Sequence, residues 1–344
     1  MDALLKKLLE APGISGYEKE VALIMKEELG RSCEECFLDG LGNVIARKGS
    51  GKKKLLLAAH MDEVGLLVKH ITKEGYLNFI KIGGIDDRVL VSQRVIVKGA
   101  GGDVKGIIGS KPPHLQKDEE RKKPVSYEEM FIDIGCVSRE EAEKKVAVAD
   151  QVVFEPNSGT LGNALCYGKA VDDRVGCYVL LKAMEKVKVD AEIYAVATVQ
   201  EEVGLKGART ASFRINPDFA LALDTTVSGD TPNIQERETS LKLGAGAAIT
   251  IIEAAGRGLI VGENVRNLCI NAARNNGIKY QLDVVEGGMT DGAMIYMNRE
   301  GIPTGVLSVP SRYIHSSTSV FSMDDVNSAV QLCVKILEAA ASGV

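Results

Sequence analysis

The chain has 344 residues, of which 45% are hydrophobic and 26% are charged, and its formal net charge at pH 7 is −5. This composition is ordinary for a globular protein with a large core, and the slightly acidic balance argues against nucleic acid or an anionic membrane surface as a partner. No apolar run approaches the roughly 18 residues of a membrane span, and residues 1–13 mix charges into their apolar stretch, unlike a signal peptide. We therefore expect a cytoplasmic protein with no nucleic-acid and no membrane partner.

Helix-like and strand-like segments alternate along much of the chain, which predicts an α/β domain with a mixed sheet flanked by helices. Apolar residues at helical spacing predict helices at 2–10, 17–30, 173–187, 205–212, 263–277, 291–299 and 323–341. Apolar or β-prone runs predict strands at 43–48, 54–59, 191–200, 219–223, 279–285 and 302–309. Ser15 is expected to cap the second helix, and Gly277 suits the position that follows a helix end.

The alternation of helix-like and strand-like segments is interrupted after the strand predicted at 54–59. Short β-prone runs separated by glycines predict a small all-β domain inserted at residues 67–163, which leaves the larger domain discontinuous at 1–66 and 164–344. Within the insert, the stretch 111–125 is dense in charge and proline and predicts an exposed, mobile loop. Because this loop contains His114, we consider that it reaches a functional site of its own or a neighbouring subunit; a plain solvated loop is the alternative.

The sequence lacks the motifs of several common types of functional site. The pair Cys33 and Cys36 has no second cysteine pair for a zinc site, so we interpret both as unremarkable thiols. The glycines of 99–102 and 286–293 do not form the phosphate-binding pattern with its lysine. No serine or cysteine stands in a G-x-S-x-G pattern, so covalent catalysis has no visible nucleophile.

Residues that bind metals stand at the ends of four apolar runs, those at 55–59, 193–200, 219–223 and 302–309. In an open α/β sheet the ligand crevice lies outside the carboxyl ends of the strands, so side chains far apart in sequence converge there. Asp172 adds a further carboxylate at the start of a predicted helix. The candidate site residues are His60, Asp62, Asp172, Glu201, Glu202, Asp224 and His315.

Two histidines with several carboxylates are the ligand mixture of a two-metal hydrolase. Such a site needs ligands on each ion, one carboxylate that bridges both, and a free base for the water. The available ligands are His60, Asp172, Glu202, Asp224 and His315. This choice leaves Glu201 as the general base and Asp62 as the group that orients His60.

Each candidate also has an ordinary structural explanation. A lone histidine at a strand end is more often a hydrogen-bonded surface residue than a ligand. Adjacent Glu201 and Glu202 would point to opposite faces of a regular strand, and they serve one site only if the chain turns near Gly204. Asp172 could simply cap a helix, and Asp224 a turn. The repeated placement at strand ends, taken jointly, is what favours a shared metal site.

Six motifs in order resemble the M42 family of dinuclear metallo-aminopeptidases. The motifs are AAHMDEVG (58–65), GKAVDDRVG (168–176), VQEEVGLKGA (199–208), ALDTT (222–226), EGGMTDGA (286–293) and PSRYIHS (310–316). The resemblance extends over nearly the whole chain, and every ligand position matches the family pattern. It implies the dinuclear zinc peptidase fold and an enzyme that removes N-terminal residues from peptides with a free N-terminus.

The resemblance also implies a role for each site residue. His60 and Asp224 would hold one ion, Glu202 and His315 the other, and Asp172 would bridge the two. Glu201 would be the general base and Asp62 the partner of His60. The family uses two divalent ions, zinc or cobalt. Its inserted β domain mediates dimerisation, and six dimers close into a hollow tetrahedral dodecamer.

Other functions remain open at this point. Some members of the family carry older endoglucanase labels, but a glycosidase needs two carboxylates that flank a sugar bond and has no use for two histidines. The chain could also be a non-catalytic shell or binding protein, or a metal-dependent amidase or deacylase on the same scaffold. The preferred N-terminal side chain and the native metal are not indicated by the sequence.

Overall fold

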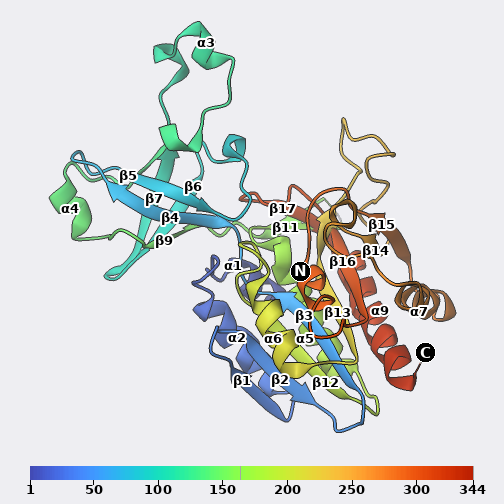
Figure 1. Ribbon diagram of the computed structural model, residues 1–344. Coiled ribbons are helices and arrows are strands. Elements are labelled where there is room, and N and C mark those ends of the chain that lie inside the picture. Colours follow the sequence, from blue (N-terminus) through green and yellow to red (C-terminus); the bar gives the residue numbers. More distant parts are fainter. Residues whose placement is uncertain (163, 344) are drawn as a thin grey trace.

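The structure is a computed structural model that describes residues 1–162 and 164–343. It consists of a large sheet flanked by helices and a closed β-barrel at one side of it (Figure 1). None of the helices in these two ranges is long and apolar enough to cross a membrane. The helices are α1 (Ala3–Glu10), α2 (Lys19–Gly30), α3 (Asp118–Arg121), α4 (Arg139–Glu143), α5 (Val171–Lys186), α6 (Lys206–Ile215), α7 (Glu263–Asn275), α8 (Asp291–Ile295) and α9 (Met323–Ser342).

The large sheet has eleven strands of mixed direction. They are β1 (Glu35–Leu38), β2 (Val44–Lys48), β3 (Lys54–His60), β10 (Gly159–Leu161), β11 (Leu165–Gly168), β12 (Glu192–Thr198), β13 (Phe219–Val227), β14 (Ala247–Ile252), β15 (Tyr280–Val284), β16 (Thr304–Arg312) and β17 (Ser319–Ser322). Strands β12, β3, β13 and β16 lie side by side and run parallel, so their carboxyl ends share one edge. The prediction of a mixed sheet flanked by helices is confirmed.

Strand β3 is central because it is buried on both faces. Its side chains alternate in direction: Leu55 and Leu57 belong to the core on the face covered by α5 and α9, whereas Leu56 and Ala58 belong to the core on the face covered by α6 and α8. A strand covered on both faces is apolar throughout, which is why the run 54–59 predicted it. The helices on the two faces of the sheet therefore hold the carboxyl ends of its central strands in place.

The β-barrel is formed by β4 (Gly65–Ile71), β5 (Leu77–Ile82), β6 (Arg94–Gly99), β7 (Gly102–Gly109), β8 (Phe131–Asp133) and β9 (Gln151–Phe154), in the closed order β4-β5-β8-β7-β6-β9. It has its own core, separate from that of the large sheet. The barrel strands span 65–154, whereas the predicted insert was 67–163. Strand β10 at 159–161 falls inside the predicted insert but joins the large sheet. Residue 163, where the predicted insert ends, lies outside the described residues.

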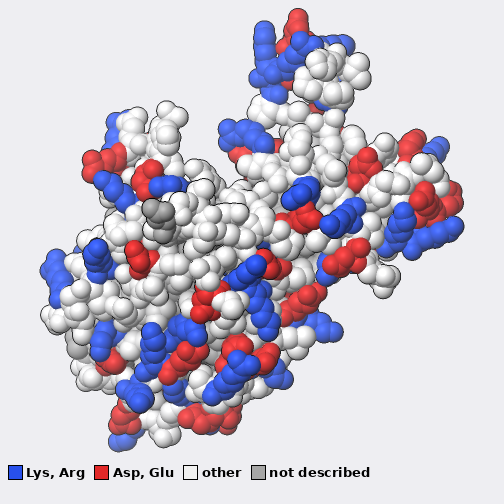
Figure 2. Space-filling model, turned by 180° about the vertical axis from the view of Figure 1, so that it is seen from behind, with Lys and Arg blue, Asp and Glu red and all other residues white. Residues whose placement is uncertain are grey.

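The charged stretch 111–125 projects from the barrel and carries α3 near its tip (Figure 1). Most of its side chains are exposed, and Lys111 and Glu120 pair across it with a nitrogen–oxygen distance of 3.0 Å. Figure 2 shows blue and red side chains intermixed at this projection. The expected exposed loop is thus present. No residue of it is among the described residues that line the pocket containing His60 and Asp172 at the carboxyl edge, so any contact with a site of its own or a neighbouring subunit stays a prediction.

Some predicted details differ from the structure. Ser15 does not cap α2; its hydroxyl donates to the Asp62 carboxylate at 2.6 Å instead. Strand β13 continues four residues past 223 because Asp224 to Val227 stay paired with β16. Helix α8 ends at Ile295 rather than 299, and a turn follows in which the Ile302 amide bonds back to Tyr296. Strands β1, β11, β14 and β17 of the large sheet were not predicted.

A buried arginine joins the N-terminal helix to the end of β3. The Arg174 Nε atom donates to the Met61 carbonyl at 2.7 Å, and Nη1 donates to the carbonyls of Leu8 at 2.7 Å and Ala11 at 3.0 Å. Arg174 has no exposed surface. The last carbonyls of a helix need partners from outside it, so this guanidinium both completes α1 and fixes the chain next to His60.

Replacing Arg174 by Met should lower the free energy of unfolding by about 3–5 kcal/mol, because buried carbonyls lose their donors and the buried Glu63 loses a cation 3.7 Å away. Urea unfolding of the metal-free protein measures the effect without the contribution of bound ions. Arg31→Met is the matched control, since Arg31 makes only exposed ion pairs and its loss should barely move the midpoint. Equal midpoints for both variants would contradict the role of Arg174.

Candidate active site

The carboxyl edge of the large sheet brings the predicted site residues together. His60 is the last residue of β3, and Asp224 lies in β13 beside it. Glu201 and Glu202 follow β12 by three and four residues, and His315 follows β16 by three residues. These four strands are neighbours in the sheet, so their ends are adjacent in space. The pocket there has a cavity volume of about 350 Å³.

Two groups of ligand-type side chains form within this pocket. His60, Glu201 and Asp224 make one group, and Asp172, Glu202 and His315 make the other. Within each group the candidate ligand atoms lie within 4.8 Å of one another. Asp62 does not belong to either group. The spacing is suitable for one cation per group.

Asp172 lies between the two imidazoles. One of its carboxylate oxygens is 3.1 Å from His60 Nε2, and the other is 3.3 Å from His315 Nε2. Asp224 lies 4.0 Å from His60 Nε2, and Glu202 lies 3.3 Å from His315 Nε2. The single carboxylate of Asp172 therefore links the two groups.

Both imidazoles present the same nitrogen to the carboxylates. His60 Nδ1 lies 3.2 Å from the Asp62 carbonyl, and His315 Nδ1 lies 3.0 Å from the Gly84 carbonyl. A carbonyl only accepts hydrogen bonds, so Nδ1 is the donor in each ring. This arrangement is the usual one for metal-ligating histidines, in which the outer nitrogen is held by a carbonyl or carboxylate.

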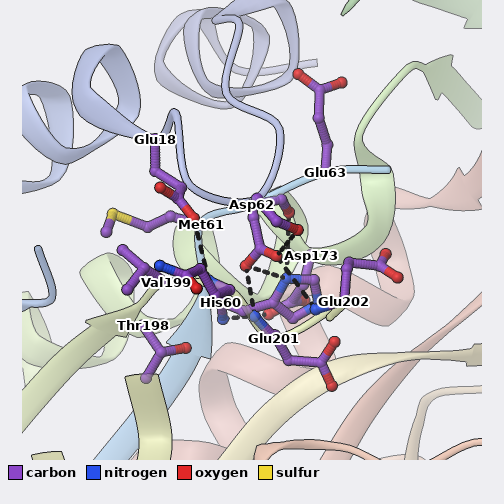
Figure 3. Close-up of polar contacts among 12 residues, drawn as sticks. Glu18, His60, Met61, Asp62, Glu63, Asp173, Thr198, Val199, Glu201 and Glu202 are labelled. Atoms are coloured by element: carbon purple, nitrogen blue, oxygen red, sulfur yellow. Dashed lines mark hydrogen bonds and ion pairs between the residues drawn. The ribbon is translucent and has the colours of Figure 1, made fainter. Parts of the chain in front are cut away.

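The chain turns sharply between β12 and the two glutamates. Gln200 has a φ of +56°, in the left-handed region, and the Gly204 amide donates to the Glu201 carbonyl at 2.9 Å. As Figure 3 shows, the side chains of Glu201 and Glu202 point in different directions from this turn. A turn was the condition under which both glutamates could serve one site, and it places one in each group.

Asp62 holds this turn in place. Its carboxylate accepts from the amides of Glu201 at 3.0 Å and Glu202 at 3.1 Å (Figure 3). The His60 Nδ1 atom is 3.5 Å from the same carboxylate, farther than from the Asp62 carbonyl. Asp62 therefore orients the two glutamates more directly than the imidazole, a task that the local spacing His60-x-Asp62 did not indicate.

Burial and mutual repulsion govern the ionisation of this cluster. Burial raises the pKa of Glu201 and of Asp224 well above the usual range, and neighbouring carboxylates add to both shifts. Burial would also raise the pKa of Asp172, but its hydrogen bonds to His315 and His60 lower it far below normal. Burial opposes protonation of His315, yet Asp172 and Glu202 raise its pKa to about 11.

These observations fit divalent cations. Several carboxylates and two neutral imidazole nitrogens form a donor set suited to zinc, cobalt or manganese. Burial and, after it, neighbouring carboxylates raise the pKa values of Glu201 and Asp224, and no lysine or arginine among the described pocket-lining residues offsets this negative charge. The residues present can therefore hold metal at both groups.

Sequence reasoning missed the buried polar residues behind the site. Lys169 lies 1% exposed and donates to Glu63 at 2.7 Å, next to Asp62 in the chain. The Asp173 carboxylate accepts from the His60 amide at 3.3 Å. Contacts across more than a hundred residues of sequence leave no local signal. Only the position of Lys169 and Asp173 within the motif GKAVDDRVG could have drawn attention to them.

Comparison with known proteins agrees with this geometry. The model of the family described as M42 glutamyl aminopeptidase matches residues 42–332. The lysyl aminopeptidase of Pyrococcus furiosus is 34% identical over 97% of this chain and 96% of its own length. Among solved structures, a TET aminopeptidase from the Thaumarchaeota archaeon SCGC AB-539-E09 has a TM-score of 0.94 at 40% identity, covering 97% of this chain and 95% of that one.

A second solved structure is the Pyrococcus horikoshii TET1 peptidase, described as assembling into a tetrahedron or a large octahedral shell. It has a TM-score of 0.87 at 34% identity and covers 99% of both chains. Family model, sequence relatives and structures agree over nearly the full length. The chain therefore belongs to the M42 family of aminopeptidases and is a peptidase.

Proposed function

We propose that this chain is a dinuclear metal-dependent aminopeptidase that removes N-terminal residues from peptides. The observation that carries the proposal is the position of Asp172, whose two oxygens face His60 and His315 separately. In this assignment His60 and Asp224 would hold one ion, Glu202 and His315 would hold the other, and Asp172 would bridge them. Glu201 lies in the same group as His60 and Asp224 but would stay free to act as the base. Zinc and cobalt are the ions that we propose.

The chain's own residues then have distinct tasks. Bound ions would act as Lewis acids on the scissile carbonyl and would lower the pKa of a water molecule toward about 7. Glu201 takes the proton from this water and passes it to the leaving amine. Asp62 fixes the Glu201 backbone, so the carboxylate stays aimed at the reacting atoms.

We further propose that the protein works within a hollow homododecamer built from dimers. The barrel at 65–154 lies to one side of the catalytic sheet, where it is free to contact a second copy (Figure 1). The Pyrococcus horikoshii relative, described as forming a tetrahedron or an octahedral shell, supports this proposal. The barrel would provide the dimer interface.

The function is tested with aminoacyl-p-nitroanilides and their N-acetylated counterparts, using protein loaded with zinc or cobalt. We expect cleavage of the free substrates, no cleavage of the acetylated ones, and loss of activity with a chelator. Cleavage of acetylated substrates would favour the alternative of an amidase. Absence of any turnover with ions bound would favour a non-catalytic shell protein.

Glu201→Gln should reduce kcat by at least about 10³-fold, because glutamine cannot accept the water's proton. Metal content should stay near that of the wild type, since the ligand set that we propose does not include Glu201. Steady-state kinetics and metal analysis on the same preparation measure both quantities. A fully metallated variant with near-normal kcat would show that another group is the base.

Binding of the ions should release protons from the metal-free protein. Asp172 and Glu202 raise the pKa of His315 to about 11, and nearby carboxylates raise the pKa of His60 against the opposing effect of burial, so the charged form of either ring must lose a proton to become a ligand. Affinity for zinc should therefore weaken as the pH falls. Calorimetric titration in two buffers of different ionisation enthalpy counts the released protons.

The variant His315→Asn should release fewer protons than the wild type in this titration. The exposed His114 of the barrel projection provides the control, and His114→Asn should match the wild type. Zinc binding without proton release would contradict the assignment of the imidazoles as ligands.

A further inference from the structure

The active-site pocket extends from the ligand cluster to a carboxylate that neither ion group uses. It crosses the ends of β13, β14 and β15, where Val227, Val285 and Met289 provide apolar walls. Glu253, the residue directly after β14, is also part of the lining. This end of the pocket has the length and apolar surface to hold a side chain of a bound peptide.

Glu253 is an incompletely paired carboxylate. Its side chain is only 1% exposed. One oxygen accepts from the Thr290 hydroxyl at 2.6 Å, whereas Oε2 is buried without a hydrogen-bond partner among the described residues. Buried carboxylates normally have all their acceptors satisfied or carry a cationic partner. Glu253 therefore carries a buried, unpaired carboxylate oxygen at the wall of this pocket, and a ligand reaches it once the side chain turns toward the cavity.

The surroundings of Glu253 favour a positive ligand. Among the described residues that line the pocket there is no lysine or arginine, and the two histidines belong to the proposed ion ligands. Burial raises the pKa of the Glu253 carboxyl to about 7, and the nearby Asp291 contributes in the same direction. A cation at this place would favour the charged form of the Glu253 carboxyl, whereas the carboxylate of an acidic side chain would disfavour it.

We propose that Glu253 is a specificity residue that binds the ammonium or guanidinium of a basic N-terminal residue, so that the enzyme prefers peptides beginning with lysine or arginine. This inference rests on the proposed aminopeptidase function. The long methylene stem of either side chain lies along Val227, Val285 and Met289, while its charged end reaches Glu253. Family membership does not decide this point, since the family is described as glutamyl and the Pyrococcus furiosus relative as lysyl.

The test compares kcat/KM for lysyl, arginyl, leucyl and glutamyl p-nitroanilides with ion-loaded protein. We expect the basic substrates to exceed the leucyl substrate at least about tenfold, with the glutamyl substrate lowest. Glu253→Gln retains an oxygen for the Thr290 hydroxyl but loses the charge. It should lower the lysyl-to-leucyl ratio at least about tenfold, mainly through KM.

Two control variants separate charge from structure. Glu286→Gln removes the same charge from an exposed position near the pocket and should keep the lysyl-to-leucyl ratio. Thr290→Val removes the hydrogen bond to Glu253 but leaves the carboxylate, so the preference for lysine should persist even if overall activity falls. A wild type that prefers leucyl or glutamyl substrates would overturn the proposal. An equal fall in kcat/KM for all four substrates in Glu253→Gln would also overturn it.

Calorimetric binding of free L-lysine and L-leucine tests the subsite without turnover. The wild type should bind lysine at least about tenfold more tightly than leucine, and Glu253→Gln should lose this difference. If the wild type binds lysine through Glu253 but turns over no substrate, the proposed aminopeptidase function is contradicted and the proposed lysine subsite is not. If the enzyme cleaves the substrates but shows no preference for lysine in kinetics or in calorimetry, only the proposed role of Glu253 is contradicted.

Discussion

Carboxylates packed together away from water repel one another and lose their hydration, and this constraint governs the centre of the molecule. Asp172, Glu202 and Asp224 meet there with two imidazoles as the nearest cationic groups. Without further positive charge, burial keeps the pKa values of Glu201 and Asp224 high. The arrangement is understandable if divalent cations supply the missing charge, with Asp172 shared between them.

The rest of the structure keeps these groups from moving apart. Four adjacent strand ends set the spacing, and the layers on both faces of β3 make that edge stiff. Behind it, Arg174 fixes the Met61 carbonyl and Lys169 neutralises Glu63. Asp62 ties the turn at Glu201 and Glu202 to the same segment. Preorganisation of this kind lets electrostatic stabilisation act without rearrangement during the reaction.

The sequence predicted the parts of the site that depend on strand ends. His60 and Asp224 follow apolar runs that predict buried strands, so their convergence follows from the geometry of parallel strands. The diverging directions of Glu201 and Glu202 depend on a left-handed residue, Gln200, whose type does not reveal that conformation. The pairing of Lys169 with Glu63 depends on the tertiary fold alone.

Fold prediction had the same limits. Long periodic segments such as α5 and α9 could be predicted almost to the residue, because their apolar spacing reflects burial. Strand β1 was missed since none of its side chains is fully buried and its four residues carry no strong alternation. Strand β14 lies in a stretch that gave no helix or strand prediction, and the carboxylate that follows it, Glu253, was missed for that reason.

The central claim is that Asp172 is shared by two metal ions. Anomalous X-ray diffraction from crystals of the zinc-loaded protein, recorded on both sides of the zinc absorption edge, tests it most directly. The account predicts two peaks about 3.5–4 Å apart, one beside His60 and one beside His315, with an oxygen of Asp172 next to each. A single peak, or a second peak that Asp172 does not contact, would contradict it.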